Sequence, residues 1–403
     1  MGDESGRVRP SPAGYCGDVK LLVISHTEHY RRGGQIVGWG ATVREIDHLA
    51  SLFERVVHIA PLHPGPAPES AIPYQAGHVE LIPVPPAGGR TLGSKPGILW
   101  RIPRYVRVIL RELRRADAVH VRCPANISLV AIVLLALLKQ PRTRWIKYAG
   151  NWSPQAGEAW SYRFQRWWLR RNFVRGVVTV NGEWPDQPEH VVSFLNPCLT
   201  DEELEEGRAA AAGKHLREPL RLIFVGRVEQ AKGIGRALDV VSLLTAAGVS
   251  VCLDVVGDSP ERARFEQQAR QAGIEARVRF HGALPRTALP ALYRDAHFVL
   301  LPSSSEGWPK VLSEAMAYGA VPLASAVGSV PDYLARFGTG RALDPDDIRG
   351  YVEAIRYYAA HPDEWKGEST RSAEAAAAFS YRAYLHAVQR LPGMPAQAAR
   401  VDR

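Results

Sequence analysis

Cysteine is scarce in this chain, with four among 403 residues and no CxxC pair or cluster. Disulfide frameworks and cysteine-ligated zinc sites depend on such spacing, so the sequence predicts neither. Long apolar runs are also missing, because the longest, Leu129 to Leu138, falls well short of the roughly 20 residues that span a bilayer. That run is typical of a buried helix. The first residues contain no apolar segment of the secretory type, and a cytoplasmic protein is therefore expected.

Acidic residues are outnumbered: 50 lysines and arginines against 41 aspartates and glutamates give a net charge of +9. A basic excess indicates an anionic partner, such as nucleic acid, an anionic membrane surface or a polyphosphate ligand. The sequence shows no helix-turn-helix pattern, zinc finger or RNP-type aromatic strand, so nucleic acid is not expected as a partner.

Strand-like and helix-like segments alternate along the chain. Short segments rich in β-branched residues, such as VKLLVIS and AVHVRC, are separated by stretches with helical spacing, and the alternation restarts at Leu220 with RLIFVGR. Alternating βα units predict parallel sheets with helices on both faces. We expect one α/β domain at 18–196, a linker at 197–219 and a second α/β domain at 220–378. Ligands of such sheets bind at the carboxyl ends of the strands, here in a cleft between the domains.

Two glutamates eight positions apart, Glu306 and Glu314, stand in the segment SSSEGWPKVLSEAMAYGAVPLAS. Pro309 suits the first turn of a helix and Gly319 suits its end, which leaves Glu306 on the preceding loop and Glu314 inside the helix. Gly307 and the free N–H groups of the helix start are available to an anion. A sugar nucleotide fits this layout, with hydroxyls at both ends and a diphosphate between them. The alternative is a pair of solvated carboxylates around an ordinary buried helix.

Two cations follow a predicted strand in RLIFVGRVEQAKGIGRAL, where Arg227 stands at the strand exit and Lys232 five residues later. Gly226 keeps the backbone open beside them. A guanidinium grips a diphosphate with two hydrogen bonds, and an ammonium adds a point charge that stabilises the leaving group. The alternative is a pair of surface cations beside Glu229.

These motifs together, above all EGWPKVLSEAMAYG, closely resemble the Glu-x7-Glu signature of retaining glycosyltransferases with the GT-B fold, the large family-four type (glycosyl transferases group 1). The resemblance is strong over 220–345 and looser before it. It implies two Rossmann-like domains that face a cleft, with a last helix at 379–392 that packs back on the first domain. It also implies that the donor is a nucleoside-diphosphate sugar, with UDP expected as the nucleotide in preference to GDP. Neither a metal nor a cofactor is expected.

The resemblance also implies roles for particular residues. Arg227 and Lys232 would bind the diphosphate and stabilise it as it leaves, Glu306 would hold hydroxyls of the transferred sugar, and Glu314 would hold the ribose. The implied donor-binding set is Gly33, Gly34, Gly226, Gly307, Trp308, Lys310, Val311 and Glu314. Pro309 replaces a glycine of many members and lacks an N–H, so the amides around it must serve instead.

Two parts of the first half depart from familiar patterns. Gly33 and Gly34 in RRGGQIVGWG are expected on a loop before a helix, resembling the loop that faces the donor phosphate, although an ordinary turn is the alternative. Many relatives carry a sugar-contacting histidine after the strand RWIKYAG, where this chain has YAGNW. His26 and Asn151 are therefore candidates for contacting the sugar or the acceptor, whereas His120 is expected to be a core or rim histidine.

Two segments, 100–115 and 159–175, have the pattern of basic amphipathic helices with tryptophans at their edges. The first has arginines at 104, 107, 111 and 114, and the second at 163, 166 and 170. Such faces suit an anionic membrane surface, while the alternative is a pair of ordinary helices with charges facing solvent.

The sequence thus predicts a retaining glycosyltransferase that moves a sugar to an acceptor hydroxyl, with a lipid-linked or cell-envelope polysaccharide acceptor among the options. Peripheral attachment to the inner face of a membrane agrees with this prediction. Two alternatives stay open: a sugar-nucleotide epimerase on the same fold, and a subunit that binds the sugar nucleotide without catalysis.

Overall fold

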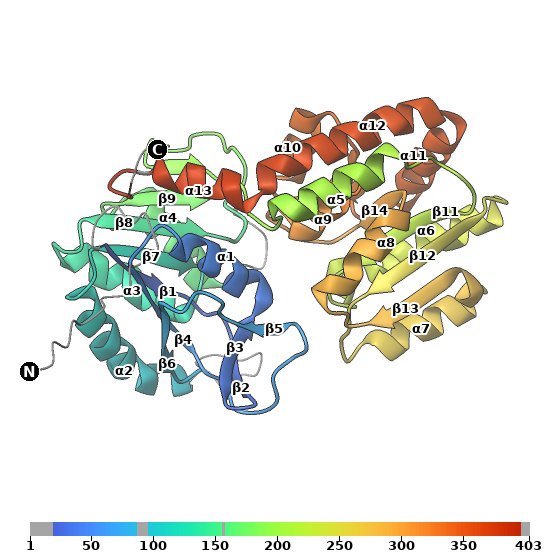
Figure 1. Ribbon diagram of the computed structural model, residues 1–403. Helices are drawn as coiled ribbons and strands as arrows, with labels where there is room; N and C mark the ends of the chain where they lie inside the picture. Colours follow the sequence, from blue (N-terminus) through green and yellow to red (C-terminus); the bar gives the residue numbers. More distant parts are fainter. Residues whose placement is uncertain (1–18, 87–95, 155–157, 396–403) are drawn as a thin grey trace, which may run out of the picture.

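The computed structural model describes residues 19–86, 96–154 and 158–395. They form two lobes side by side, each with a parallel sheet between layers of helices (Figure 1). Along the described chain, no helix combines the length and the apolar character that crossing a bilayer requires.

The first lobe is built on a seven-stranded parallel sheet of order β10-β9-β8-β7-β1-β4-β6. Side chains of one sheet face pack with α2, α3 and α4, and those of the other face pack with α1 and α13. The strands are β1 (Lys20–Ile24), β4 (Arg55–Pro61), β6 (Val79–Val84), β7 (Ala118–Cys123), β8 (Thr143–Tyr148), β9 (Val177–Val180) and β10 (Val191–Ser193). The helices of this lobe are α1 (Gly40–Ala50), α2 (Pro96–Leu113), α3 (Asn126–Leu137) and α4 (Trp160–Arg170).

A small antiparallel sheet of β2 (His29–Arg32), β3 (Gln35–Trp39) and β5 (Ala71–Pro73) stands beside this core. Gly33 and Gly34 form the two-residue turn between β2 and β3, with φ of +54° and +82°. Positive φ at both turn residues is what such a tight hairpin requires, which explains the glycine pair. The sequence placed the pair on a loop before a helix, and the structure places it in this hairpin turn, with β3 between the turn and α1.

The second lobe holds a six-stranded parallel sheet of order β13-β12-β11-β14-β15-β16. Its strands are β11 (Leu220–Val225), β12 (Val251–Val256), β13 (Val278–Gly282), β14 (Phe298–Leu301), β15 (Val321–Ser325) and β16 (Arg341–Leu343). Its helices are α5 (Asp201–Ala212), α6 (Ile234–Ala246), α7 (Arg262–Gln271), α8 (Leu289–Asp295), α9 (Lys310–Ala317), α10 (Val330–Phe337), α11 (Ile348–Ala360) and α12 (Pro362–Ala375).

Helix α5 lies within the segment that the sequence assigned to a linker. Thr200 and Glu203 form a capping box at its start, and Leu204 joins the hydrophobic core of the second lobe. Gly207 lets α5 approach α9 closely, since a Cβ there would lie 2.5 Å from the carbonyl oxygen of Ala317. The sequence missed this packing because the small residues of α5 leave only a narrow apolar edge.

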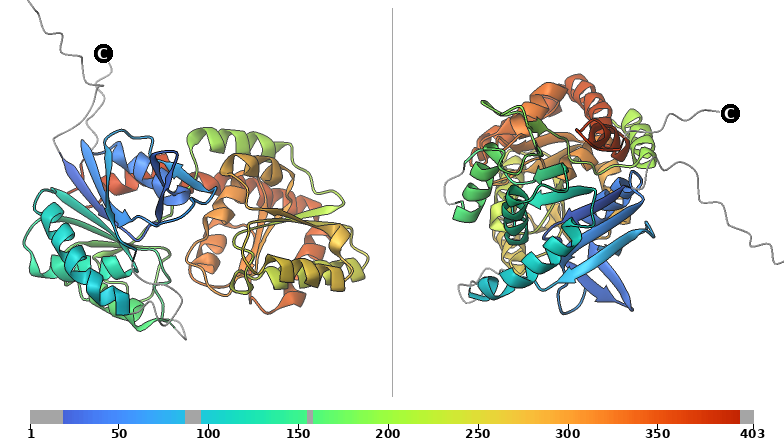
Figure 2. Two further views of the ribbon diagram at one scale, coloured as in Figure 1. Left: turned by 90° about the horizontal axis from the view of Figure 1, so that it is seen from below. Right: turned by 90° about the vertical axis from the view of Figure 1, so that its left-hand side faces the viewer.

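The last helix, α13 (Tyr381–Gln389), returns to the first lobe. It runs beside α1 in Figure 1, and the left view of Figure 2 again shows this helix, in red, beside the blue elements of the first lobe. Tyr384 and Val388 belong to the hydrophobic core that includes Trp145. The predicted fold, two Rossmann-like α/β domains with a returning helix, is therefore confirmed.

Candidate active site

The exit of β11 brings one predicted cation onto a predicted carboxylate. The chain leaves β11 through Gly226, whose N–H donates to the carbonyl of Val256, and Lys232 ends a short 3-10 turn. Lys232 Nζ lies 2.7 Å from Oε1 of Glu306, and Ser303 Oγ donates to the same oxygen at 3.0 Å. Residues 74 positions apart in the chain thus meet where β11 and β14 end.

Gly233 makes this meeting sterically feasible. It adopts φ +81°, and a Cβ there would lie 1.9 Å from the carbonyl oxygen of Pro302, just after β14. Arg227 lies nearby in the chain but not in this cluster. Its side chain is 59% exposed and forms an ion pair with Glu229, so its guanidinium is accessible to a ligand.

Helix α9 separates the two glutamates as the sequence predicts. Glu306 lies on the loop before it, Glu314 lies inside it, and Gly319 follows its end with φ +73°. Pro309 is the residue before the first helical one rather than part of the first turn. Residue 310 therefore carries the first of the free N–H groups at the start of the helix.

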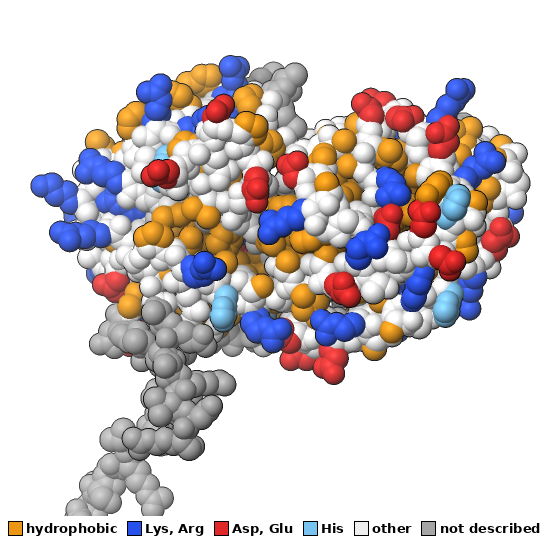
Figure 3. Space-filling view, turned by 90° about the horizontal axis from the view of Figure 1, so that it is seen from above, with side chains coloured by type: hydrophobic (Ala, Val, Ile, Leu, Met, Phe, Trp, Pro, Cys, Tyr) orange, Lys and Arg blue, Asp and Glu red, His pale blue; other side chains and the backbone are white. Residues whose placement is uncertain are grey.

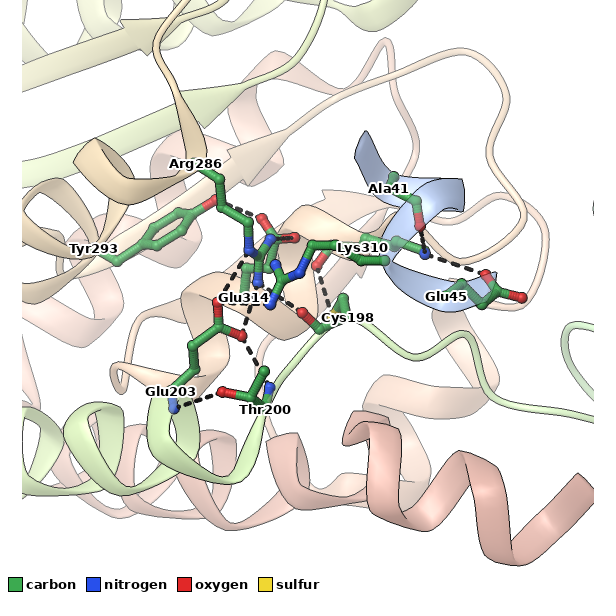
Figure 4. Close-up of polar contacts among 10 residues, drawn as sticks. Ala41, Glu45, Cys198, Thr200, Glu203, Arg286, Tyr293, Lys310 and Glu314 are labelled. Carbon is green, nitrogen blue, oxygen red and sulfur yellow. Dashed lines mark hydrogen bonds and ion pairs between the residues drawn. The ribbon is translucent and has the colours of Figure 1, made fainter. Parts of the chain in front are cut away.

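Glu314 is buried and already has partners in the second lobe (Figure 4). It forms an ion pair with Arg286 and accepts a hydrogen bond from Tyr293 Oη at 3.1 Å. Arg286 also donates to Glu203 at 3.1 Å and to the carbonyl of Cys198 at 2.6 Å. Burial alone would lower the pKa of Arg286, but Glu314 and Glu203 raise it, so the guanidinium stays charged.

Sequence reasoning did not find Arg286. It stands four residues after the end of β13, and its place soon after a strand was the available signal. Any ribose hydroxyl that reaches Glu314 must share the carboxylate with this guanidinium.

Two other residues of the predicted donor-binding set, Trp308 and Val311, have side chains that pack inside the second lobe. The Trp308 indole is 3% exposed, stacks on Phe379 at 5.1 Å and donates to Ser313 Oγ at 2.7 Å, so only its backbone can serve a ligand. Val311 is partly buried against the core of the second lobe.

Gly307 lies where the lobes meet. A Cβ at this position would come within 3.2 Å of Asn181 Nδ2 and 3.5 Å of the Ala149 carbonyl, both on the first lobe. Its own carbonyl accepts from the N–H and the Oγ of Ser329, at 3.1 and 2.9 Å. The loop after β15 thus supports the loop of Glu306.

Lys310 crosses from the second lobe to the first. Its Nζ lies 3.3 Å from the carbonyl oxygen of Ala41 and 3.4 Å from Oε2 of Glu45 (Figure 4). Glu45 is fully buried and also contacts Arg122 and Lys147 at 2.6 and 2.7 Å. Burial would raise the pKa of Glu45, but these three cations outweigh it and hold that pKa well below the ordinary value.

The candidate residues of the first lobe do not form a cluster comparable to that of Lys232 and Glu306. Gly33 and Gly34 have open space where a Cβ would point, and their donor-facing role stays a prediction. His26 is exposed just after β1, and Asn151 accepts the Ser153 N–H at 3.0 Å through its side chain. His120 is fully buried, stacks on Trp145 at 3.7 Å, and has no hydrogen-bond partner among the described residues.

Within the described ranges, His, Cys, Asp and Glu side chains do not gather in groups of three that fit a metal ion.

Comparison with known proteins agrees with this geometry. Residues 209–378 match the family model described as glycosyl transferases group 1. This part of the chain, less than half of its length, is similar to that family. The match contains Arg227, Lys232 and both glutamates, and it supports the predicted resemblance to group 1 glycosyl transferases.

Curated relatives match over part of the chain. Glycogen synthase of Mycobacterium tuberculosis is 30% identical over 146 residues, and 2-deoxystreptamine glucosyltransferase of Streptomyces kanamyceticus is 35% identical over 133 residues. These matches cover 36% and 33% of this chain and 35% and 34% of those proteins. The matched segment therefore spans about a third of the relatives' length.

Solved structures match over both lobes. Sucrose-phosphate synthase of Thermosynechococcus elongatus has a TM-score of 0.69 at 20% identity, with 92% of this chain and 97% of that chain covered. HepE of Anabaena, solved with UDP and glucose, has a TM-score of 0.65 at 16% identity, with 92% and 98% covered. These likenesses show the GT-B fold.

Proposed function

We propose that this protein is a retaining glycosyltransferase that moves a sugar from a nucleoside-diphosphate sugar to an acceptor hydroxyl. The contact of Lys232 with Glu306 carries the proposal, because it joins a cation for the diphosphate to a carboxylate for the sugar at one point. Glu314, eight residues further along, is then available to the other end of the same donor.

In this proposal the diphosphate leaves and the acceptor arrives on the same face of the sugar. Arg227 and Lys232 stabilise the negative charge that develops on the leaving diphosphate, which is where preorganised cations contribute most. Glu306 already accepts from Lys232 and Ser303, which suits a group that orients sugar hydroxyls. An oxygen of the leaving phosphate takes the acceptor proton.

UDP is the nucleotide we propose for the donor. HepE of Anabaena, which shares the fold, was solved with UDP and with UDP-glucose. The identity of the sugar is left to a donor screen, because the loops that select it differ among members of one fold.

We further propose that the first lobe docks on an anionic membrane, where a lipid-linked acceptor would be presented. Trp100 is 87% exposed on α2, and Trp160 and Trp167 are 72% and 46% exposed on α4. Basic side chains gather at the outer end of the first lobe in Figure 3. One predicted member of the stripe is corrected: Arg166 is buried and pairs with Glu158 at 2.5 Å.

The proposed activity is tested by incubating the protein with UDP-glucose, UDP-galactose, UDP-N-acetylglucosamine and GDP-mannose and measuring released nucleoside diphosphate. We expect release with one donor and its loss in Lys232→Met, while Lys139→Met, at a surface position outside the cleft, keeps the wild-type rate. Conversion of the donor to an epimer without release would indicate the epimerase alternative. Donor binding without either product would indicate the non-catalytic one.

Membrane docking is tested by co-sedimentation with vesicles that contain phosphatidylglycerol. Trp160→Ser should reduce the bound fraction, since an exposed indole inserts at the interface. Equal binding to purely zwitterionic vesicles would contradict the role given to the arginines.

A further inference from the structure

Three cations surround one buried carboxylate where the two lobes meet. Arg122 and Lys147 contact Oε1 of Glu45 at 2.6 and 2.7 Å, and Lys310 contacts Oε2 at 3.4 Å. Tyr384 Oη lies 3.4 Å from Oε1. The residues come from β7, β8, α9 and α13, so this cluster exists only when both lobes and the returning helix are in place.

The cluster has more positive than negative charge. Within the described part of the chain, Glu45 is the carboxylate that Arg122, Lys147 and Lys310 contact, and no second acidic side chain joins them. Removing unbalanced cations from water is costly, and buried charges are normally paired. An anion from outside the chain would supply the missing charge.

The position of the cluster in the fold suits a ligand site, although the side chains of Arg122 and Lys147 are only 12% and 5% exposed. Arg122 and Lys147 are near the carboxyl ends of β7 and β8, the edge of a parallel sheet at which ligands bind. Lys310 is the first residue of α9, whose free N–H groups favour anions, and its side chain is 22% exposed.

We propose that Arg122, Lys147 and Lys310 form a phosphate-binding subsite in the cleft, separate from the pair Arg227 and Lys232. The phosphate comes either from the diphosphate of the donor or from a phosphate group on the acceptor. This inference rests on the proposed function, which brings both substrates into the cleft. Glu45 holds the three cations in position, and the incoming phosphate binds on their cleft side.

The subsite has a measurable consequence in proton uptake. Burial lowers the pKa of Lys147 to about 7, with Glu45 opposing the shift and the nearby charges of Arg122 and Lys310 adding to it. The titratable groups near Lys147 are Glu45, Arg122, Lys310, Tyr384 and the buried His120. A bound phosphate raises this pKa, so at pH 8 the neutral amine takes up roughly one proton per bound ligand.

Isothermal titration calorimetry at pH 8, repeated in buffers of different ionisation enthalpy, counts the protons taken up. In the first arm UDP is titrated into the protein, and in the second inorganic phosphate is titrated into protein saturated with UDP. Lys147→Met removes the titrating group while Arg122 and Lys310 still pair with Glu45. Lys214→Met is the matched control, because Lys214 is also buried, with a pKa lowered to about 7 by burial, but lies outside the cleft against the carbonyls of Tyr293 and Ala296.

Uptake in the first arm that is lost in Lys147→Met and kept in Lys214→Met supports the subsite and assigns it to the donor. The same pattern in the second arm assigns it to a phosphate on the acceptor. UDP binding without uptake in either arm, or uptake that persists in Lys147→Met, overturns the subsite and leaves the proposed function standing. Failure of both UDP and GDP to bind overturns the proposed function and the subsite with it.

Discussion

Gly328 offers the sharpest test of how the Glu306 loop is held. The residue has φ +59°, and a Cβ there would lie 2.1 Å from the carbonyl oxygen of Glu306 and 2.8 Å from that of Gly307. Because ordinary contact needs about 3.5 Å, Gly328→Ala should push this loop back by more than about 1 Å. A displacement of that size at a reacting centre lowers the rate by roughly 100-fold.

The matched control is Gly248→Ala. Gly248 follows α6 with φ +75° and has no atom within 4 Å of the position of a Cβ. It therefore shares the backbone penalty of about 1–2 kcal/mol without the steric clash. Thermal unfolding should show that loss in both variants, with an additional loss for Gly328→Ala.

Donor turnover distinguishes the two variants. Gly248→Ala should keep wild-type kcat/KM at a temperature where both variants are folded, and Gly328→Ala should lose about two orders of magnitude. If Gly328→Ala keeps kcat/KM close to that of Gly248→Ala, the loop after β15 does not position Glu306, and the reasoning is refuted.

Further predictions concern the donor site and stability. Arg227→Ala should lower kcat while the free energy of unfolding in urea stays within about 0.5 kcal/mol of wild type, since this side chain is 59% exposed; a large loss of stability would contradict this role. Glu314→Ala should weaken UDP binding in calorimetry at least about tenfold, and unchanged affinity would refute the ribose assignment. Trp308→Ala should cost about 3–5 kcal/mol in urea unfolding, because the stacked indole is fully enclosed. Burial depresses the folded pKa of Lys214 to about 7, so the unfolded state binds more protons between pH 7 and 10 and stability should rise over that range. Lys214→Met should flatten this rise in thermal unfolding measured across pH.

Local patterns in the sequence predict much of this structure. Strands such as RLIFVGR and HFVLLPS can be recognised from a local period of two residues, and helices from a period of 3.6 residues. The spacing of Glu306 and Glu314 could be interpreted in the same way. These patterns were sufficient to predict two parallel sheets, with Glu306 before a short helix and Glu314 inside it. Arg227 and Lys232 were likewise predictable as candidates, because both lie in the segment between β11 and α6.

The sequence could not predict which distant side chains meet. Arg286 reaches Glu314 and Glu203 only because η4 (Arg286–Ala288), α9 and α5 converge, and no spacing along the chain records that convergence. The outward stripe of the second basic helix failed at Arg166 for the same reason, since Glu158 draws it inward.

What the sequence by itself determined is therefore the alternation of strands and helices and the resemblance of residues 209–378 to group 1 glycosyl transferases. What only the tertiary structure decided is the electrostatics of the cleft. Glu45 belongs to a helix of the first lobe and Lys310 to a helix of the second, 265 residues apart. Their contact depends on how two separately built domains face each other, and that arrangement is fixed by packing between domains rather than by any local pattern.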